Sequence, residues 1–193
     1  MPPAAQEHIL TITTSFFDTP NRMGLLPTGM AEAEIAAEHV RRAGMDSTNV
    51  GAMAEEMIHV LHAIDPALTG GGAGLGYGFR RAAEDVRTAI QLAASVQGAP
   101  ESLLYHAPFV ESAATGAMAR ADDAVALARQ IQGSTDAVSA HRLVDRLAAV
   151  VRAMTWGEDR DGDGRIGGDV AEAGLAQARY HLELVRRMEG PGQ

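Results

Sequence analysis

The chain has 193 residues, of which 46% are apolar, and this is enough to bury the core of one domain without disulfide bonds. Its formal net charge of −9 argues against nucleic-acid binding and against docking on an anionic membrane, because both need a basic surface. It contains no Cys, which excludes disulfide frameworks, thiolate metal sites and cysteine nucleophiles.

The order of apolar residues and breakers predicts one helical domain. Residues 1–27 show no clear period and contain two prolines, so we expect an irregular lead segment there and a single helical domain at 28–193. Apolar residues then recur every three or four positions, which predicts helices. Caps and breakers place them at about 28–42, 47–64, 79–97, 101–133, 134–156 and 169–188, with a kink or interruption at Pro108. The sequence therefore predicts an all-α bundle of about five to six helices.

The sequence contains no candidate for a membrane span. No stretch reaches the roughly 18 apolar residues that a membrane span needs. The N-terminal residues lack the basic start and apolar run of a signal peptide. We expect no membrane span.

An acidic stretch, Asp159–Val170, is the most informative part of the chain. Hard Ca²⁺ prefers six to eight oxygen ligands, and a loop supplies them when alternate residues point inward. Asp159, Asp161 and Asp163 stand at positions 1, 3 and 5 of such a loop. A glycine at position 6 permits the sharp turn, and the backbone oxygen of Arg165 would be the ligand at position 7.

This stretch resembles the DxDxDG loop of the EF-hand family, and the resemblance covers about residues 145–188. It implies a C-terminal helix–loop–helix unit that binds Ca²⁺. The chain departs from the family at position 12, where Val170 replaces the bidentate Glu. Asp169 and Glu172 are the nearby substitutes, and either one requires a shifted start of the following helix.

Two interpretations of the acidic loop remain open at this stage: a structural Ca²⁺ site of modest affinity, or an acidic turn that binds no ion. Three alternating carboxylates repel each other unless a cation screens them, which favours the site. A lone, incomplete loop suits compartments with millimolar Ca²⁺, so we expect a periplasmic or secreted protein. Sensors usually pair two loops, so a switch is disfavoured.

The histidines offer an alternative function as a transition-metal or haem carrier binding Fe, Cu, Zn or haem. His59 and His62 share one face of the helix predicted at 47–64, preceded by two glutamates. In a bundle, other helices would complete the site. Its candidate ligands are Glu55, His59, His62, His39 and His106. A single Glu-x-x-His unit does not fit a di-iron bundle, and the opposing interpretation is that these residues are polar rim residues.

The glycine-rich stretch 69–78 resembles a phosphate cradle, but it lacks Gly-Lys-Ser/Thr and follows no predicted strand, so we interpret it as a connector. No catalytic constellation emerges, and we do not expect an enzyme. The leading hypothesis is a calcium-binding helical bundle with a structural or partner-binding role. A module that docks a protein partner through an apolar groove remains a third possibility.

Overall fold

The computed structural model describes residues 1–190, and these form helices and loops without a strand, which confirms the all-α prediction. Seven α-helices and two short 3₁₀ turns make up this part of the chain. They are α1 (Pro3–Thr13), η1 (Pro20–Arg22), α2 (Leu25–Ala43), α3 (Val50–Ile64), η2 (Pro66–Leu68), α4 (Phe79–Ser95), α5 (Glu101–Gln132), α6 (Ala137–Trp156) and α7 (Leu175–Met188).

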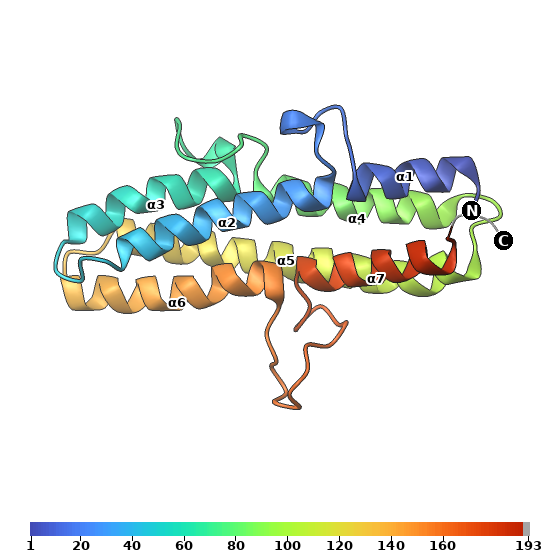
Figure 1. Cartoon of the computed structure of the whole chain (residues 1–193). Helices are drawn as coiled ribbons and strands as arrows, with labels where there is room; N and C mark the ends of the chain where they lie inside the picture. The colour runs from blue at the N-terminus through green and yellow to red at the C-terminus, as the bar shows by residue number, and fades with distance from the viewer. Residues whose placement is uncertain (191–193) are drawn as a thin grey trace.

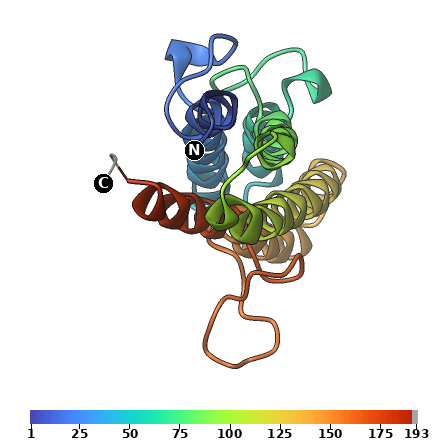
Figure 2. The ribbon, with the colours of Figure 1, turned by 90° about the vertical axis from the view of Figure 1, so that its right-hand side faces the viewer.

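The helices build a four-rod bundle (Figure 1). One rod is α5, whose 32 residues span about 48 Å at 1.5 Å per residue. Each other rod consists of two helices laid end to end: α1 with α2, α3 with α4, and α6 with α7. Consecutive rods run in opposite directions, and the view along the bundle shows the four columns (Figure 2). The N-terminal amino group lies 3.5 Å from Oε2 of Glu189, so the chain leaves the bundle at the end where it entered.

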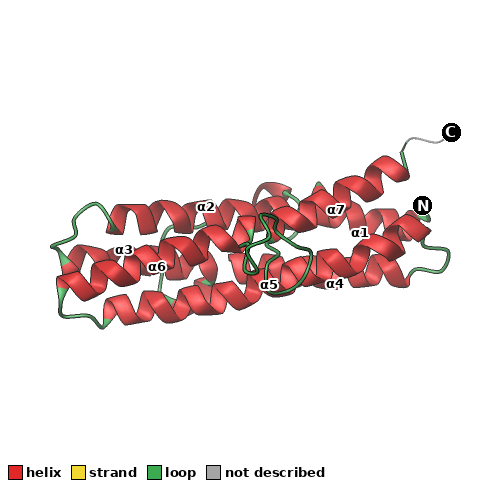
Figure 3. Cartoon of the chain, turned by 90° about the horizontal axis from the view of Figure 1, so that it is seen from below, coloured by secondary structure: helices red, strands yellow, loops and turns green. Residues whose placement is uncertain are grey.

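A loop interrupts each of the three divided rods near its middle. The segments are 14–24, the glycine-rich loop at 65–78 and the acidic loop at 157–174. Seen from below, the acidic loop lies over the middle of the bundle, between the facing ends of α6 and α7 (Figure 3). These two helices therefore continue one another along α5, and they do not cross as a packed helix pair.

Small side chains fill much of the core. More than a dozen alanines are fully buried beside medium-sized apolar residues such as Met53, Leu61 and Ile90. Alanine lets helix axes approach closely, and α5 uses this to contact α4, α6 and α7 at once. No helix among residues 1–190 combines the length and the apolar character that crossing a bilayer requires.

The expected irregular segment at 1–27 is wrong in its first half, because residues 3–13 form α1. Ala5, Ile9 and Ile12 follow each other at spacings of four and three and are buried. Pro3 occupies the first turn, where its missing N–H needs no partner. Pro27 lies in the first turn of α2 for the same reason, so that helix begins at Leu25 and not at residue 28.

Two further boundaries differ from expectation. Pro108 does not interrupt α5, because Pro108 and Leu104 both face solvent and water can satisfy the carbonyl of Leu104 that Pro108 leaves free. The last helix begins at Leu175 and not near residue 169. The acidic loop is correspondingly longer than the EF-hand resemblance implied.

Candidate metal site in the acidic loop

The two ends of the acidic loop are fastened to each other. The N–H of Glu158 donates to the carbonyl oxygen of Glu172 at 2.9 Å. Gly157 has a φ of 77°, which favours glycine, and a Cβ there would collide with the same carbonyl. A Cβ on Gly174 would lie 2.6 Å from the backbone nitrogen of Gly157. The neck of the loop is therefore a close backbone-to-backbone contact that needs both glycines.

Glu172 is the buried carboxylate of this loop, with 5% of its surface exposed. One oxygen, Oε1, accepts hydrogen bonds from the N–H groups of Arg160 at 3.0 Å and Asp161 at 3.2 Å. The other oxygen, Oε2, accepts from the N–H of Gly167 at 2.6 Å. The side chain thus ties both halves of the loop to one point near the bundle.

Asp159 organises the first turn of the loop. Its Oδ1 accepts from the N–H of Gly162 at 2.8 Å and its Oδ2 accepts from the N–H of Gly164 at 2.9 Å. Both glycines have positive φ, 78° and 83°, as a tight turn around a side chain requires. The sequence prediction of a turn at Gly164 is consistent with this backbone.

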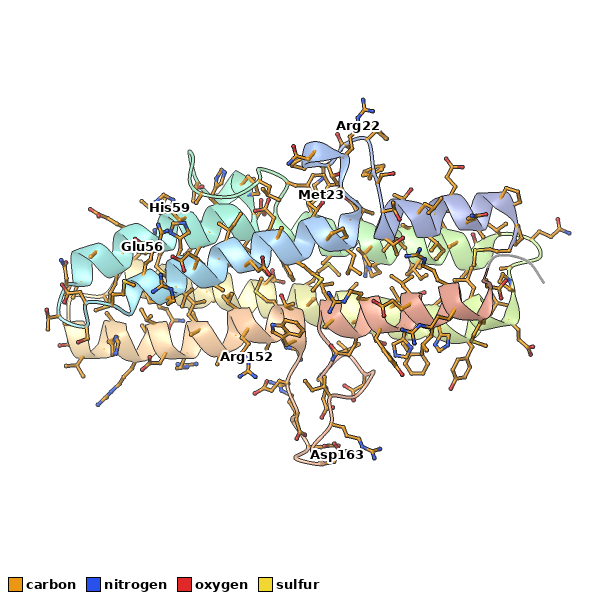
Figure 4. The ribbon with its side chains drawn as sticks, in the orientation of Figure 1. Arg22, Met23, Glu56, His59, Arg152 and Asp163 are labelled. Atoms are coloured by element: carbon orange, nitrogen blue, oxygen red, sulfur yellow. The ribbon has the colours of Figure 1, made fainter. Side chains whose placement is uncertain are left out.

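Three carboxylates converge in the loop. One oxygen each from Asp159, Asp161 and Glu172 lies within 4.8 Å of the others, and the two aspartates are exposed while Glu172 is buried. Among residues 1–190, this is the one group of three or more acidic or histidine side chains with ligand atoms this close. Asp163 lies outside the group, at the tip of the loop (Figure 4), and its Oδ1 accepts from the N–H of Arg165 at 2.8 Å.

Of the two substitutes expected for position 12, Glu172 joins the group of carboxylates and Asp169 does not. Oδ1 of Asp169 accepts from the N–H groups of Ala171 at 2.7 Å and Glu172 at 3.1 Å. Asp169 therefore stabilises the backbone turn that directs the Glu172 side chain inward. Val170 is 44% exposed on that turn. Counted from Asp159 as position 1, Glu172 is position 14. The backbone oxygen of Arg165 stays a predicted ligand.

A buried arginine from α5 fixes the exit of the loop. Arg120 is 8% exposed and donates from Nη1 to the carbonyl oxygen of Ala173 at 2.7 Å and from Nη2 to that of Ala171 at 2.5 Å. Burial lowers the pKa of its guanidinium. Gly116, one turn earlier on α5, lacks the Cβ that would collide with the carbonyl of Val170. Sequence analysis missed both residues, because neither belongs to the loop motif.

The candidate ligands of the alternative site do not all lie together, although His39 and His59 are neighbours. His39 of α2 bonds through Nδ1 to Oε2 of Glu56 at 2.6 Å, whereas Glu55 is exposed. The His39 ring stacks on that of His59, with centroids 4.4 Å apart. Figure 4 shows Glu56 and His59 together on α3. His62 bonds instead to Oγ1 of Thr69 at 3.0 Å.

The hydrogen bond of His59 disfavours a metal there. Its Nδ1 accepts the N–H of Ala73 at 2.9 Å, so the ring proton is on Nε2. A metal on Nε2 would move that proton to Nδ1, against a backbone donor. His106 lies elsewhere, between α5 and α7, and bonds to His181, which sequence analysis did not pair with it.

The backbone N–H groups of the glycine-rich loop bind a carboxylate side chain of the protein itself. Glu32 of α2 is fully buried and accepts the N–H groups of Leu75 at 3.0 Å, Tyr77 at 3.1 Å and Gly78 at 2.9 Å. These donors precede α4, where a phosphate would otherwise bind. Arg81 pairs with Asp18 and Asp85. The structure thus supports the interpretation of this loop as a connector.

Comparison of the chain with protein-family models, with curated proteins and with solved structures found no match.

Proposed function

We propose that the chain is a calcium-binding helical-bundle protein in which the acidic loop holds one Ca²⁺ for a structural or partner-binding role. The observation that carries this proposal is the convergence of Asp159, Asp161 and Glu172. Hard oxygen donors of this kind suit Ca²⁺ better than Zn²⁺ or Cu²⁺, which favour nitrogen and sulfur.

The donor set fits a Ca²⁺ site of modest strength. Three carboxylates give one oxygen each, and Asp163, the carbonyl of Arg165 and water are available to complete the six to eight oxygens that Ca²⁺ takes. Two of the three carboxylates are exposed and already accept hydrogen bonds from backbone N–H groups. The free energy gained when they bind an ion is therefore limited. We infer a dissociation constant of about 10⁻⁴–10⁻³ M, as in extracellular modules, and a periplasmic or secreted location.

The position of the loop suggests what the ion would do. Because α6 and α7 lie end to end, an ion in the loop would not set a crossing angle between packed helices. It would instead neutralise the carboxylates and close the loop that joins the two halves of one rod. Ca²⁺ would then stabilise the native bundle by binding it in preference to the unfolded chain.

Trp156, the one tryptophan of the chain, provides a direct test, since it ends α6 at the start of the loop. We expect Ca²⁺ titration into chelator-treated protein to change its fluorescence with a single transition near the inferred dissociation constant. Calorimetry and elemental analysis should give about one Ca per chain. Glu172→Gln should weaken binding at least tenfold, while Asp145→Asn, an exposed change on α6, should not. Unchanged binding in Glu172→Gln, or no Ca uptake by the wild type, would refute the proposal.

A further inference from the structure

A pair of histidines joins α5 to α7 next to the acidic loop. Nδ1 of His106 lies 2.9 Å from Nδ1 of His181, and His106 is 7% exposed. The ring centroids are 5.1 Å apart, close to the N–N distance plus the two ring radii. The two nitrogens therefore face each other head-on, in hydrogen-bond geometry. A tetrahedral metal bound to both nitrogens would hold them roughly 3.3 Å apart, and both lone pairs would point at the ion and not at the opposite nitrogen.

The hydrogen bond between the two Nδ1 atoms contains one hydrogen. One Nδ1 must carry hydrogen and donate, and the other must be bare and accept. The accepting ring is therefore neutral, with its proton on Nε2. The donating ring can be neutral or cationic, so the bonded pair holds at most one positive charge. Protonation of both rings removes the acceptor and places two cations against each other.

The groups that face the pair are mainly aromatic. The Phe109 ring stacks on His181 with centroids 4.5 Å apart and 6° between planes, and Tyr105 and Tyr180 pack edge-on against His106 and His181. Within residues 1–190, no carboxylate forms a hydrogen bond or ion pair with either ring.

Three glutamates, on α5, on α7 and just after α7, have partners of their own. Glu189 bonds to Ser102, one turn before His106, and pairs with the amino group of Met1. Glu111 of α5 accepts from Gln91 of α4. On α7, Glu183 pairs with Arg187. An aromatic face stabilises one imidazolium, but it does not neutralise two.

We propose that His106 and His181 form a latch between α5 and α7 that is closed at neutral pH and opens when both rings are protonated. The latch lies beside the acidic loop, because Phe109 also contacts the backbone of Gly168 so closely that a Cβ there would be 2.6 Å from its Cδ1. Opening the latch removes the hydrogen bond between α7 and α5 and disturbs the packing of the Phe109 ring. The buried residues Leu175 and Leu182 still hold α7, so its release is local.

The test uses the full chain in chelator, so that its outcome does not depend on Ca²⁺ binding. Nitrogen-15 NMR of the imidazoles at pH 7.5 should show one ring of the pair with hydrogen on Nδ1 and the other with hydrogen on Nε2. On acidification the two rings should become imidazolium in two separate steps, because the bonded pair holds at most one positive charge. Amide exchange along α7 should accelerate at the second step. Independent titration of both rings, or unchanged exchange in α7, would overturn the proposal.

A variant gives a second, independent measurement. His181→Phe keeps a ring against Phe109 and removes the second cation, and His8→Gln is the matched control. If the two rings are coupled by one pKa unit, the wild type should lose about 3–5 °C more in Tm than His181→Phe between pH 7.5 and 5.0. His8→Gln should behave as the wild type does. Equal losses in all three proteins would contradict the latch, and if His181→Phe does not fold, the NMR titration of the wild type decides.

Discussion

An oxygen of Glu172 lies within 4.8 Å of an oxygen of Asp159, although the two residues stand at opposite ends of the acidic loop. The hydrogen bonds that Glu172 accepts from Arg160 and Asp161 bring the ends together. From outside the loop, Arg120 holds the exit segment against α5. The loop is therefore positioned by the bundle as well as by its own acidic motif.

Asp161 offers the cleanest test of the ion's contribution to stability, because its side chain is exposed. We expect Asp161→Ala to lower Tm in Ca²⁺ and hardly to change it in chelator. At Ca²⁺ a hundredfold above the dissociation constant, binding stabilises the wild type by about 2.7 kcal/mol, or roughly 5–11 °C in Tm. Thermal unfolding followed by circular dichroism measures the difference. Equal losses in both conditions would show that Asp161 acts through the turn alone.

Glu172 should differ from Asp161, because its carboxylate also satisfies backbone donors at the neck of the loop. Glu172→Ala should destabilise the protein in chelator by about 1–3 kcal/mol, the cost of leaving partly buried donors without a partner. Urea unfolding in chelator measures this loss. Asp169→Asn, which keeps the capping oxygen of that turn, is the matched control and should lose less. A neutral Glu172→Ala would mean that water replaces the carboxylate at no cost.

The helices from α2 onwards could be predicted from sequence because their buried residues recur at helical spacing between clear breakers. Helix α1 has the same signal in Ala5, Ile9 and Ile12, but it is short, and the prolines at 20 and 27 obscured it. The end-to-end arrangement of α6 and α7 could not be predicted, because it depends on α5 offering one continuous surface to both.

Only the part of the candidate site that lies within the loop motif could be predicted from the sequence. Alternating aspartates and a turn glycine belong to the loop itself, so the sequence predicts Asp159, Asp161 and Asp163 as candidate ligands, and the structure brings the first two together and leaves Asp163 outside the group. The choice of Glu172 over Asp169 depends on where α7 begins, which Gly174 and the neck contact determine. Arg120 is distant in sequence and interrupts an alanine-rich helix without any motif. The pairing of His106 with His181 likewise requires knowing which helices touch.

Asp136 gives the chain a predictable dependence on pH. It caps α6, with its Oδ2 accepting the N–H of Ser139 at 2.8 Å, and the bonds from the side chain and backbone of Ser139 lower its pKa. A lowered folded-state pKa means that the stabilisation is present above the ordinary Asp value of about 4 and is lost as the pH falls through the folded pKa. Asp136→Ala should therefore lower Tm at pH 7, by an amount that shrinks toward pH 3. Asp136→Asn keeps a capping oxygen and should show a smaller loss without this pH dependence.

Glu32 should be the main support of the glycine-rich loop. Glu32→Ala leaves the buried N–H groups of Tyr77 and Gly78 without an acceptor, which should cost about 2–4 kcal/mol in the free energy of unfolding. Chymotrypsin should then cleave the loop 65–78 faster than in the wild type. Glu34→Ala, an exposed change on the same helix, is the control. Unchanged cleavage would show that the loop holds its conformation without the buried carboxylate.

Arg120 should support the acidic loop whether or not an ion is bound, since its bonds reach backbone carbonyls and not the carboxylates. Arg120→Met keeps most of the buried stem and removes both donors to Ala171 and Ala173, so we expect a loss of about 1–3 kcal/mol in chelator. Amide exchange should accelerate at the loop exit while the far half of α5 stays protected. Arg129→Met, an exposed change on the same helix, should be close to neutral. If Ca²⁺ restores the protection lost in Arg120→Met, the ion and the arginine constrain the same segment. If Ca²⁺ does not restore it, α5 must position the exit segment of the loop before the carboxylates can gather around an ion.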